Sequence, residues 1–274
     1  MRLGVTMFAT DRSMPITDLA RAAEERGLVS LWVPEHTHIP VSRRTPHPSG
    51  QPLPEMYKRT LDPLVALSYA AAVTERLTVG TGIMLLAQRD PIATAKAVAT
   101  LDLLSGGRFA LGVGFGWNAE EMETHHVPYD RRREVVREHV LAMKGLWTEE
   151  AAGFAGEHVA FEPSWSWPKP ARVPPVYLGG GAGPKMFAHI AEYADGWLPL
   201  GGGGLRDALP ALREAAERAG RDPATIEVIP FGVDPDRGKL EHLAGLGVGH
   251  VVCSVPSGPA DAVLPVLDAY ASLL

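Results

Sequence analysis

The chain of 274 residues alternates eight short apolar runs with longer segments of helical period, and no other feature constrains its fold as strongly. The runs are continuously apolar rather than alternating, as expected for strands that are buried on both faces. They cover residues 2–8, 30–35, 77–84, 109–116, 175–181, 196–201, 226–233 and 250–256. Between them, segments such as 16–27, 63–77, 91–107 and 130–147 repeat apolar residues three and four positions apart.

Strands that are joined by helices run parallel, because only a crossover connection can join parallel neighbours. Eight such units predict a closed (β/α)₈ barrel, a TIM barrel, that forms one domain over residues 1–274. An open doubly wound sheet is the alternative, and it would carry G-x-G-x-x-G in its first strand-to-helix turn. That turn reads ATDRSMP here, and Gly112, Gly114 and Gly116 instead lie in the fourth run with the spacing G-x-G-x-G. We expect these glycines to leave room for a planar ligand above the barrel core.

Two insertions interrupt the alternation. Residues 36–60 follow the second run, contain five prolines and are attached at the barrel end where ligands bind, so we interpret them as a lid. Residues 148–175 separate the fourth helix from the fifth strand, and their GEHVAFEP stretch predicts a short hairpin strand followed by a proline-rich return.

The amino-acid composition limits which kinds of binding partner and which cellular compartment are expected. The formal net charge of −6 comes from interleaved acidic and basic residues, which indicates neither a nucleic-acid face nor a membrane surface and favours a small-molecule partner. No apolar run approaches the roughly 18 residues of a spanning helix, and Asp11 and Arg12 precede any signal-peptide core. We therefore expect a cytoplasmic protein, in which the single Cys253 forms no internal disulfide.

Candidate catalytic residues lie where the predicted strands end. The second run ends in Glu35-His36-Thr37-His38, and a histidine at a barrel mouth can exchange protons near neutral pH. The H-x-H pair also suggests a metal-dependent hydrolase. The fifth, sixth and eighth runs supply no His, Asp or Glu to complete such a site, so we expect no metal.

The fifth run leads through Gly179, Gly180, Gly181 and Ala182 into the next helix. Free backbone N–H groups and the positive end of a helix favour anion binding at such a position, although a glycine run also suits a tight turn.

Two further strand ends are of interest. Thr81-Gly82-Ile83 places a glycine inside the third run, where distortion of the backbone or close approach of a ligand is often the reason. Asn118 followed by Glu121 predicts a helix N-cap with a carboxylate reaching back, in a position where the Asn118 side chain would still face the barrel mouth.

Six stretches, in their order along the chain, resemble the bacterial luciferase-like superfamily of barrels, most closely its F420-dependent oxidoreductases from actinobacteria. They are WVPEHTHIP, VGTGIMLL with RDP after it, AKAVATLDLLSGGR, LGVGFGWNAEEM, PPVYLGGG and ADGW, and the resemblance covers nearly the whole chain.

The resemblance implies a flavin or deazaflavin across the carboxyl end of the barrel, with its ring against a third strand that carries a non-prolyl cis peptide. That bond would be Gly82-Ile83, beside Thr81. Glu35 and His36 correspond to the acid and histidine of the second strand.

Other positions would hold the rest of the cofactor. Gly179, Gly180 and Gly181, followed by Ala182, correspond to backbone that holds the phosphate region. Asn118 would bond the polyol chain and Gly114 would lie under the ring. Arg43, Arg44, Lys58 and Arg59 in the second loop could attract an anionic cofactor tail.

We therefore expect hydride transfer between F420 and an organic substrate, with His36 exchanging the accompanying proton. One alternative is an FMN-dependent monooxygenase that receives reduced flavin from a separate reductase. Another is a cofactor-binding barrel without catalysis. Family resemblance also implies a homodimer in which helices beside the barrel form the contact.

Overall fold

The computed structural model describes residues 1–274 and is centred on one parallel sheet of nine strands. Their order is β10-β11-β1-β2-β3-β4-β7-β8-β9. The strands are β1 (Arg2–Thr6), β2 (Ser30–Val33), β3 (Thr78–Thr81), β4 (Phe109–Val113), β7 (Val176–Gly179), β8 (Gly196–Leu198), β9 (Glu227–Val228), β10 (Phe231–Val233) and β11 (His250–Ser254).

The two ends of this sheet are consecutive pieces of one predicted strand. β9 pairs with β8 and β10 pairs with β11, and only Ile229 and Pro230 separate them. Pro230 has no N–H to donate to a ladder, which interrupts the pairing. The Ile229 N–H donates to the Trp197 carbonyl, and Leu200 forms a parallel bridge with Phe231. The sheet thus closes on itself, and the predicted eight-stranded barrel is confirmed.

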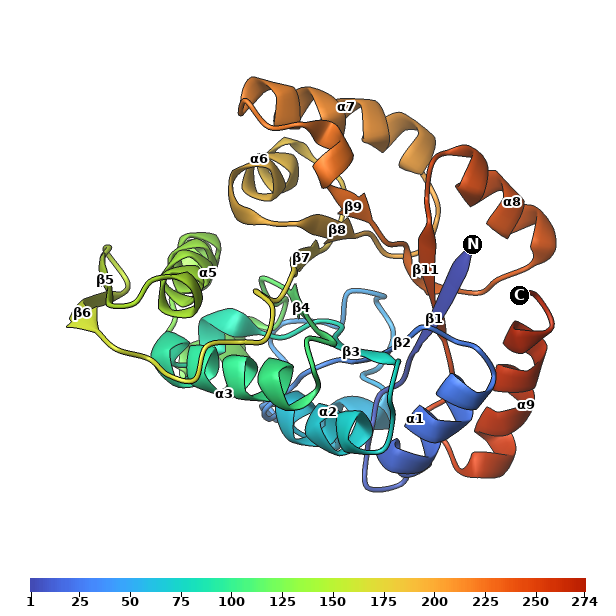
Figure 1. Ribbon diagram of the computed structural model, residues 1–274. Helices are drawn as coiled ribbons and strands as arrows, with labels where there is room; N and C mark the ends of the chain where they lie inside the picture. Colours follow the sequence, from blue (N-terminus) through green and yellow to red (C-terminus); the bar gives the residue numbers. More distant parts are fainter.

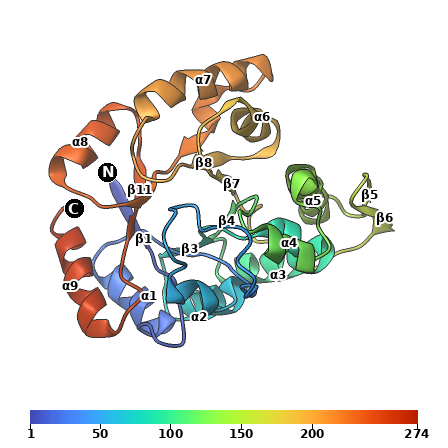
Figure 2. The same ribbon diagram turned by 180° about the vertical axis from the view of Figure 1, so that it is seen from behind.

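Helices surround this sheet in both views of the ribbon (Figures 1 and 2). They are α1 (Ile16–Glu25), α2 (Pro63–Ala72), α3 (Pro91–Leu104), α4 (Ala119–Thr124), α5 (Arg132–Thr148), α6 (Pro184–Tyr193), α7 (Leu205–Arg218), α8 (Arg237–Gly245) and α9 (Ala260–Ala271). None of them combines the length and apolarity that crossing a bilayer requires.

Local sequence explains where several of these helices begin. Asp62 precedes Pro63, and its side chain accepts hydrogen bonds from the N–H groups of Leu64 and Val65. Asp90 precedes Pro91 in the same way at the start of α3. An acidic N-cap followed by proline in the first turn favours initiation, because proline lacks the N–H that a first turn leaves unpaired.

The barrel interior is filled by bulky side chains from successive strands. Trp32, Tyr177, Leu198 and Phe231 belong to this buried inner cluster, and Ile83 packs against it. The ring of Trp32 meets those of Tyr177 and Phe231 edge to face at 6.0 Å. The barrel is therefore a packed core that can support a ligand only at its rim.

Both predicted insertions have defined structure. β5 (Ala152–Ala155) and β6 (Ala160–Ser164) form an antiparallel hairpin that projects beyond α5 in Figures 1 and 2. Residues 34–62 join β2 to α2 with only one short 3₁₀ turn, Glu55–Lys58. The Thr60 hydroxyl donates to the His36 carbonyl and the Leu61 N–H donates to the Ala9 carbonyl, which ties the end of this loop to the barrel.

Candidate functional site

A cleft of about 960 Å³ opens where the parallel strands end at their carboxyl side. Its walls come from the segments after nearly every strand, among them Phe8, His36, Ile83, Gly114 and Phe231. A volume of this size suits a cofactor together with a small substrate. A second cavity of about 680 Å³ lies beside α7 and residues 247–249, just before β11 begins. That is the barrel end where structural roles prevail.

The peptide bond between Gly82 and Ile83 is cis, as the resemblance implied. The Ile83 side chain then lies between two glycines of neighbouring strands. A Cβ atom at Gly114 would come within 2.0 Å of Ile83 Cδ1, and one at Gly179 within 2.6 Å of Ile83 Cγ2. These glycines therefore admit the Ile83 side chain to the cleft floor.

This corrects the expectation that the alternating glycines leave open space under a ligand. A Cβ at Gly112 would meet the Thr81 carbonyl oxygen at 2.0 Å, and one at Gly116 would meet the Met122 methyl group at 2.3 Å. Neighbouring atoms already fill all these spaces. Gly114 still borders the cleft, whereas Thr81 is fully buried and its hydroxyl donates to the Gly112 carbonyl.

His36 meets Glu121 at the cleft wall. Its Nδ1 atom lies 2.8 Å from Oε2 of Glu121, and the two side chains are only 6% and 1% exposed. A carboxylate at Nδ1 fixes the tautomer that carries hydrogen there and leaves Nε2 for the cleft. The pair thus has the geometry of an oriented acid–base group.

Asn118 occupies the N-cap position of α4, as predicted, but the predicted capping hydrogen bonds are absent. Glu121 reaches His36 instead. Both polar atoms of the Asn118 amide are buried without a partner, and so is Oε1 of Glu121. The physical reason is the competing partner: a buried imidazole N–H outweighs a backbone N–H at the end of a helix of only six residues.

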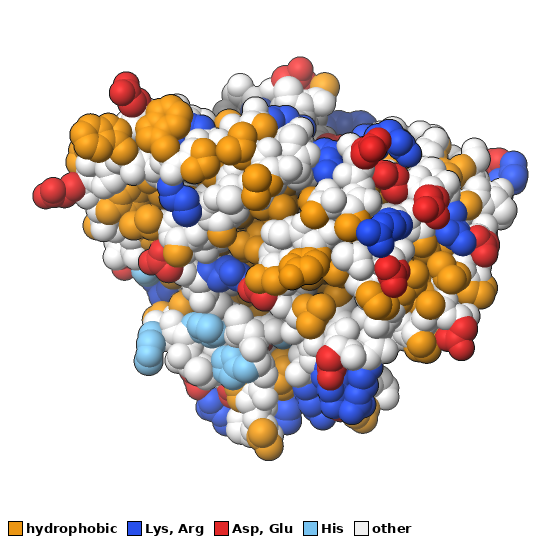
Figure 3. Space-filling model, turned by 60° about the horizontal axis from the view of Figure 1, so that its bottom comes forward, with side chains coloured by type: hydrophobic (Ala, Val, Ile, Leu, Met, Phe, Trp, Pro, Cys, Tyr) orange, Lys and Arg blue, Asp and Glu red, His pale blue; other side chains and the backbone are white.

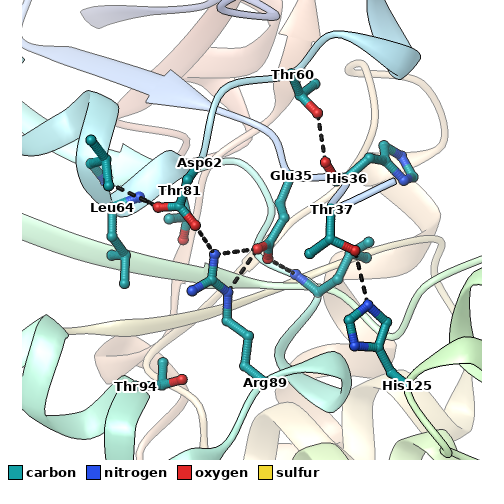
Figure 4. Close-up of polar contacts among 12 residues, drawn as sticks. Glu35, His36, Thr37, Thr60, Asp62, Leu64, Thr81, Arg89, Thr94 and His125 are labelled. Atoms are coloured by element: carbon teal, nitrogen blue, oxygen red, sulfur yellow. Dashed lines mark hydrogen bonds and ion pairs between the residues drawn. The ribbon is translucent and has the colours of Figure 1, made fainter. Parts of the chain in front are cut away.

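Glu35 is held on the other side of the same strand end. It accepts a hydrogen bond of 2.7 Å from the Leu85 N–H and another of 2.7 Å from Nε of Arg89. Arg89 also pairs with Asp62 at 2.6 Å. Figure 4 shows Arg89 between these two carboxylates, with the His36 ring pointing away from them.

The pKa shifts of Glu35 and Arg89 are consistent with a structural ion pair. Burial raises the pKa of the Glu35 carboxyl, against the opposing effect of Arg89 and the Leu85 N–H. Burial lowers the pKa of Arg89, but Glu35 and Asp62 outweigh it and raise that pKa overall. Both Glu35 oxygens are thus engaged, and His36 is the residue of this pair with a free nitrogen.

The glycine run at the end of β7 presents free backbone donors. Gly180 has φ of +142°, a conformation that side chains rarely adopt. The N–H groups of Gly181 and Ala182 find no backbone acceptor, and nothing lies within 4 Å of a Cβ built at Gly181. Gly179, Gly180 and Gly181 line the cleft, while Ala182 lies just outside it.

Two arginines that sequence reasoning missed also line the cleft. Arg132 and Arg133 line it and have no carboxylate partner, and one nitrogen of each is buried without a hydrogen bond. The Arg133 guanidinium lies 4.3 Å from the centroid of the Phe115 ring. Burial and the charge of Arg132 lower the pKa of Arg133. In the sequence they belong to DRRREVV, a charge run typical of a solvated helix face.

The loop cations expected to attract an anion are engaged elsewhere. Arg44 pairs with Glu123, and Lys58 and Arg59 both pair with Glu55. Arg43 lies over the Trp117 ring and donates to the Thr45 carbonyl.

The two histidines of the H-x-H motif have different partners. His38 bonds Thr37 through Nδ1, away from the His36–Glu121 pair, and no three His, Cys, Asp or Glu side chains gather to hold a metal ion.

A wall of aromatic rings completes the cleft. Tyr57, on the loop between β2 and α2, lies 5.1 Å from His36, 5.0 Å from His47 and 6.4 Å from Trp117, measured between ring centroids. His47 lies 5.4 Å from Trp117. Sequence reasoning passed over these residues because they are spread over a loop with no periodic pattern.

Comparison with known proteins identifies the family of this chain. The family model for luciferase-like monooxygenases matches residues 6–233. The chain belongs to this family. An uncharacterised protein of Mycobacterium tuberculosis is 42% identical over 279 residues, which cover 100% of this chain and 99% of the relative.

A functionally described relative is the F420-dependent glucose-6-phosphate dehydrogenase of Kineococcus radiotolerans. It is 32% identical over 233 residues, 80% of this chain and 65% of the relative.

Two solved structures share the fold at 19% identity and cover 100% of this chain and 98% of their own. They are the monooxygenase RslO1 of Streptomyces bottropensis, with a TM-score of 0.80, and an F420-dependent secondary alcohol dehydrogenase, with a TM-score of 0.77. The family thus includes oxidoreductases that use F420 and monooxygenases.

Proposed function

We propose that this protein is an F420-dependent oxidoreductase that transfers a hydride between the deazaflavin and a small organic substrate. The observation that carries the proposal is the His36–Glu121 pair, which places an oriented imidazole beside an apolar floor of Ile83 and Phe231. The named relative from Kineococcus supports F420 as the cofactor.

The residues around the cleft fit such a cofactor at both of its ends. Arg132 and Arg133 line the cleft without a carboxylate partner, and the N–H groups of Gly181 and Ala182 find no backbone acceptor, so these groups would bind a phosphate. Gly114 and Ile83 would support the ring, whereas Asn118, which was expected to bond the polyol chain, is 1% exposed and is not part of the cleft wall.

When bound, F420 supplies or accepts the hydride. His36 would deliver or accept the proton at Nε2, while Glu121 holds Nδ1–H and stabilises the charged ring. Glu35 would keep the Gly82–Leu85 segment in place through the Leu85 N–H, which makes it a positioning residue in this scheme.

An FMN-dependent monooxygenase served by a separate reductase is the second candidate, supported by the fold shared with RslO1. Parallel titrations of the purified protein with F420 and FMN, followed by cofactor fluorescence, test the choice. We expect F420 to bind at least tenfold more tightly. Tighter binding of FMN would overturn the F420 assignment, and tight binding of either without any turnover would favour a non-catalytic binding protein.

We also propose that the protein is a homodimer formed through α2 and α3. Both helices carry exposed apolar side chains, namely Val65, Tyr69, Ile92, Leu103 and Leu104. Figure 3 brings this side of the molecule forward and shows hydrophobic side chains between the charged ones. Light scattering should give twice the chain mass, and a Tyr69→Glu change should reduce it. A monomer at all concentrations would contradict this.

A further inference from the structure

The cleft has two flanks of different chemistry, and the loop after β4 divides them. Phe115 turns toward α6, where it lies 5.5 Å from the His189 ring and beneath the Arg133 guanidinium. Trp117, two residues on, turns toward His36, His47 and Tyr57. The cationic flank is the one that the proposed function assigns to the cofactor phosphate.

No cation lines the cleft on the other flank; Arg43, which lies over the Trp117 ring, has no carboxylate partner and keeps one buried nitrogen without a hydrogen bond, but it is not part of the cleft wall. Its cleft-lining residues are mostly apolar or aromatic: Phe8, Met56, Tyr57, Trp117, Val255 and Pro256. The only carboxylate lining the cleft is Glu35, which is engaged by Arg89 and the Leu85 N–H. The loop cations Arg44, Lys58 and Arg59 are paired with acids.

Besides the hydroxyls of Ser49 and Tyr57, this flank presents two histidines as hydrogen-bonding groups. His36 presents Nε2 because Glu121 occupies Nδ1. Nδ1 of His47 accepts from the Ser49 N–H at 3.3 Å and lies 2.7 Å from the Ser49 hydroxyl oxygen, which itself accepts from the Gln51 N–H, so the hydroxyl hydrogen is directed to Nδ1 and the neutral ring carries its hydrogen on Nε2. The ring centroids of both imidazoles lie about 5 Å from that of Tyr57, so both histidines border the same aromatic wall.

From this distribution we infer that the substrate is a neutral, largely apolar ring compound with one carbonyl or hydroxyl oxygen, held between the cofactor and the Tyr57–Trp117 aromatic wall. This inference rests on the proposed function. A phosphorylated or carboxylated substrate would leave its charge without a partner on this flank. The chain would thus differ in substrate from the glucose-6-phosphate dehydrogenase that it resembles.

The chemistry balances with groups already assigned. Reduction of the carbonyl adds a hydride from the reduced cofactor to carbon and a proton from Nε2 of His36 to oxygen, giving the alcohol and the oxidised cofactor. Oxidation of the alcohol returns both. The neutral Nδ1–H tautomer left on His36 is the one that Glu121 holds.

A binding experiment on the protein loaded with oxidised F420 tests this without turnover. The probes are 2-tetralone, the similarly sized 2-naphthoate, and glucose 6-phosphate, each followed by calorimetry. We expect saturable binding of 2-tetralone, at least tenfold weaker binding of 2-naphthoate, and no binding of glucose 6-phosphate. Equal or tighter binding of either anion overturns the inference, and so does failure of 2-tetralone to bind the F420 complex.

Substitutions of Trp117 test where 2-tetralone binds. Trp117→Leu and the milder Trp117→Phe should weaken 2-tetralone binding, the former about tenfold, whereas Trp165→Leu should not, because Trp165 is 78% exposed on the connection after β6. Unchanged affinity in both folded Trp117 variants overturns the assignment. Failure of F420 itself to bind would refute the proposed function. That outcome differs from failure of 2-tetralone to bind the F420 complex, which refutes only the substrate inference.

Discussion

His36 Nδ1 lies 2.8 Å from Glu121 Oε2, and this contact joins the end of β2 to the helix that follows β4, 85 positions away in the chain. Because Glu121 is almost fully buried, the contact holds the imidazole without competition from water. It is the relationship on which the proposed proton transfer depends.

His36→Ala should therefore lower turnover by roughly 10²- to 10⁴-fold, the range for loss of a general acid–base group, while cofactor affinity stays within a fewfold. Steady-state kinetics and F420 titration measure the two quantities. If turnover is unchanged, His36 is not the proton carrier.

Glu121→Gln should reduce turnover by roughly 10- to 100-fold, as expected for loss of a group that orients a functional imidazole. The nitrogen NMR shifts of His36 should also show loss of the single Nδ1–H tautomer. Glu123→Gln is the matched control on α4, since Glu123 is exposed and pairs with Arg44. Equal effects of the two substitutions would refute a positioning role for Glu121.

Arg133→Gln should weaken cofactor binding by roughly 10- to 100-fold, corresponding to about 1.5–3 kcal/mol for a lost charged hydrogen bond. It should lower the melting temperature of the free protein only slightly, because Arg133 has no carboxylate partner and the change removes only its contact with the Phe115 ring. Arg131→Gln, which removes only surface pairs with Glu134 and Glu157, should leave binding unchanged. Fluorescence titration at two salt concentrations measures the effect, and unaltered affinity in Arg133→Gln would remove this residue from the anion site.

Gly112→Ala should destabilise the fold by about 1–3 kcal/mol, because the new methyl group meets the rigid Thr81 carbonyl. At Gly114 the new methyl group meets the Ile83 side chain, at Cδ1 and Cγ1, rather than backbone, so Gly114→Ala should cost less and should be partly rescued by Ile83→Val, which deletes the nearest atom, Cδ1. Urea unfolding measures all of these, with Gly203→Ala as the control in open space. A Gly112→Ala protein as stable as the wild type would contradict this packing.

Stability should fall in mild acid because of His250. The Trp32 indole N–H donates to the Ser30 hydroxyl at 2.8 Å, so the hydroxyl hydrogen is directed to Nε2 of His250 at 2.9 Å. Burial, and next the charge of Arg2, lower the pKa of His250 to about 4. As the pH falls below 6.5, the ordinary pKa of histidine, the imidazole is therefore protonated in the unfolded chain before it is protonated in the folded protein. Up to about 3 kcal/mol of stability is lost between pH 6.5 and 4, with no further loss from this group below that.

The measurement is the free energy of unfolding in urea at pH 7, 6 and 5 for the wild type and for His250→Gln. The glutamine variant should be less sensitive to pH over this interval, because it has no group to protonate. Parallel pH dependences of the two proteins would show that His250 does not titrate as argued.

Much of the fold could be predicted from the order of residues. Eight continuous apolar runs separated by amphipathic segments have one economical arrangement, since strands buried on both faces and joined by helices close into a parallel barrel. The seventh run, residues 226–233, is broken into β9 and β10, and this break has a local cause in Pro230. Motif order likewise indicated the family, the cis Gly82–Ile83 bond and the cleft position of His36.

Only the tertiary structure decided which partners these residues have. Asn118 and Glu121 read as a local cap, yet Glu121 bonds a histidine from another strand. The alternating glycines read as open space, yet Ile83 and Met122 fill it. Arg132 and Arg133 read as a solvated charge run, yet they face the cleft without an acid. Periodicity reports burial within one element, whereas hydrogen bonds and charge pairing at the mouth depend on which strand ends the closed barrel brings together.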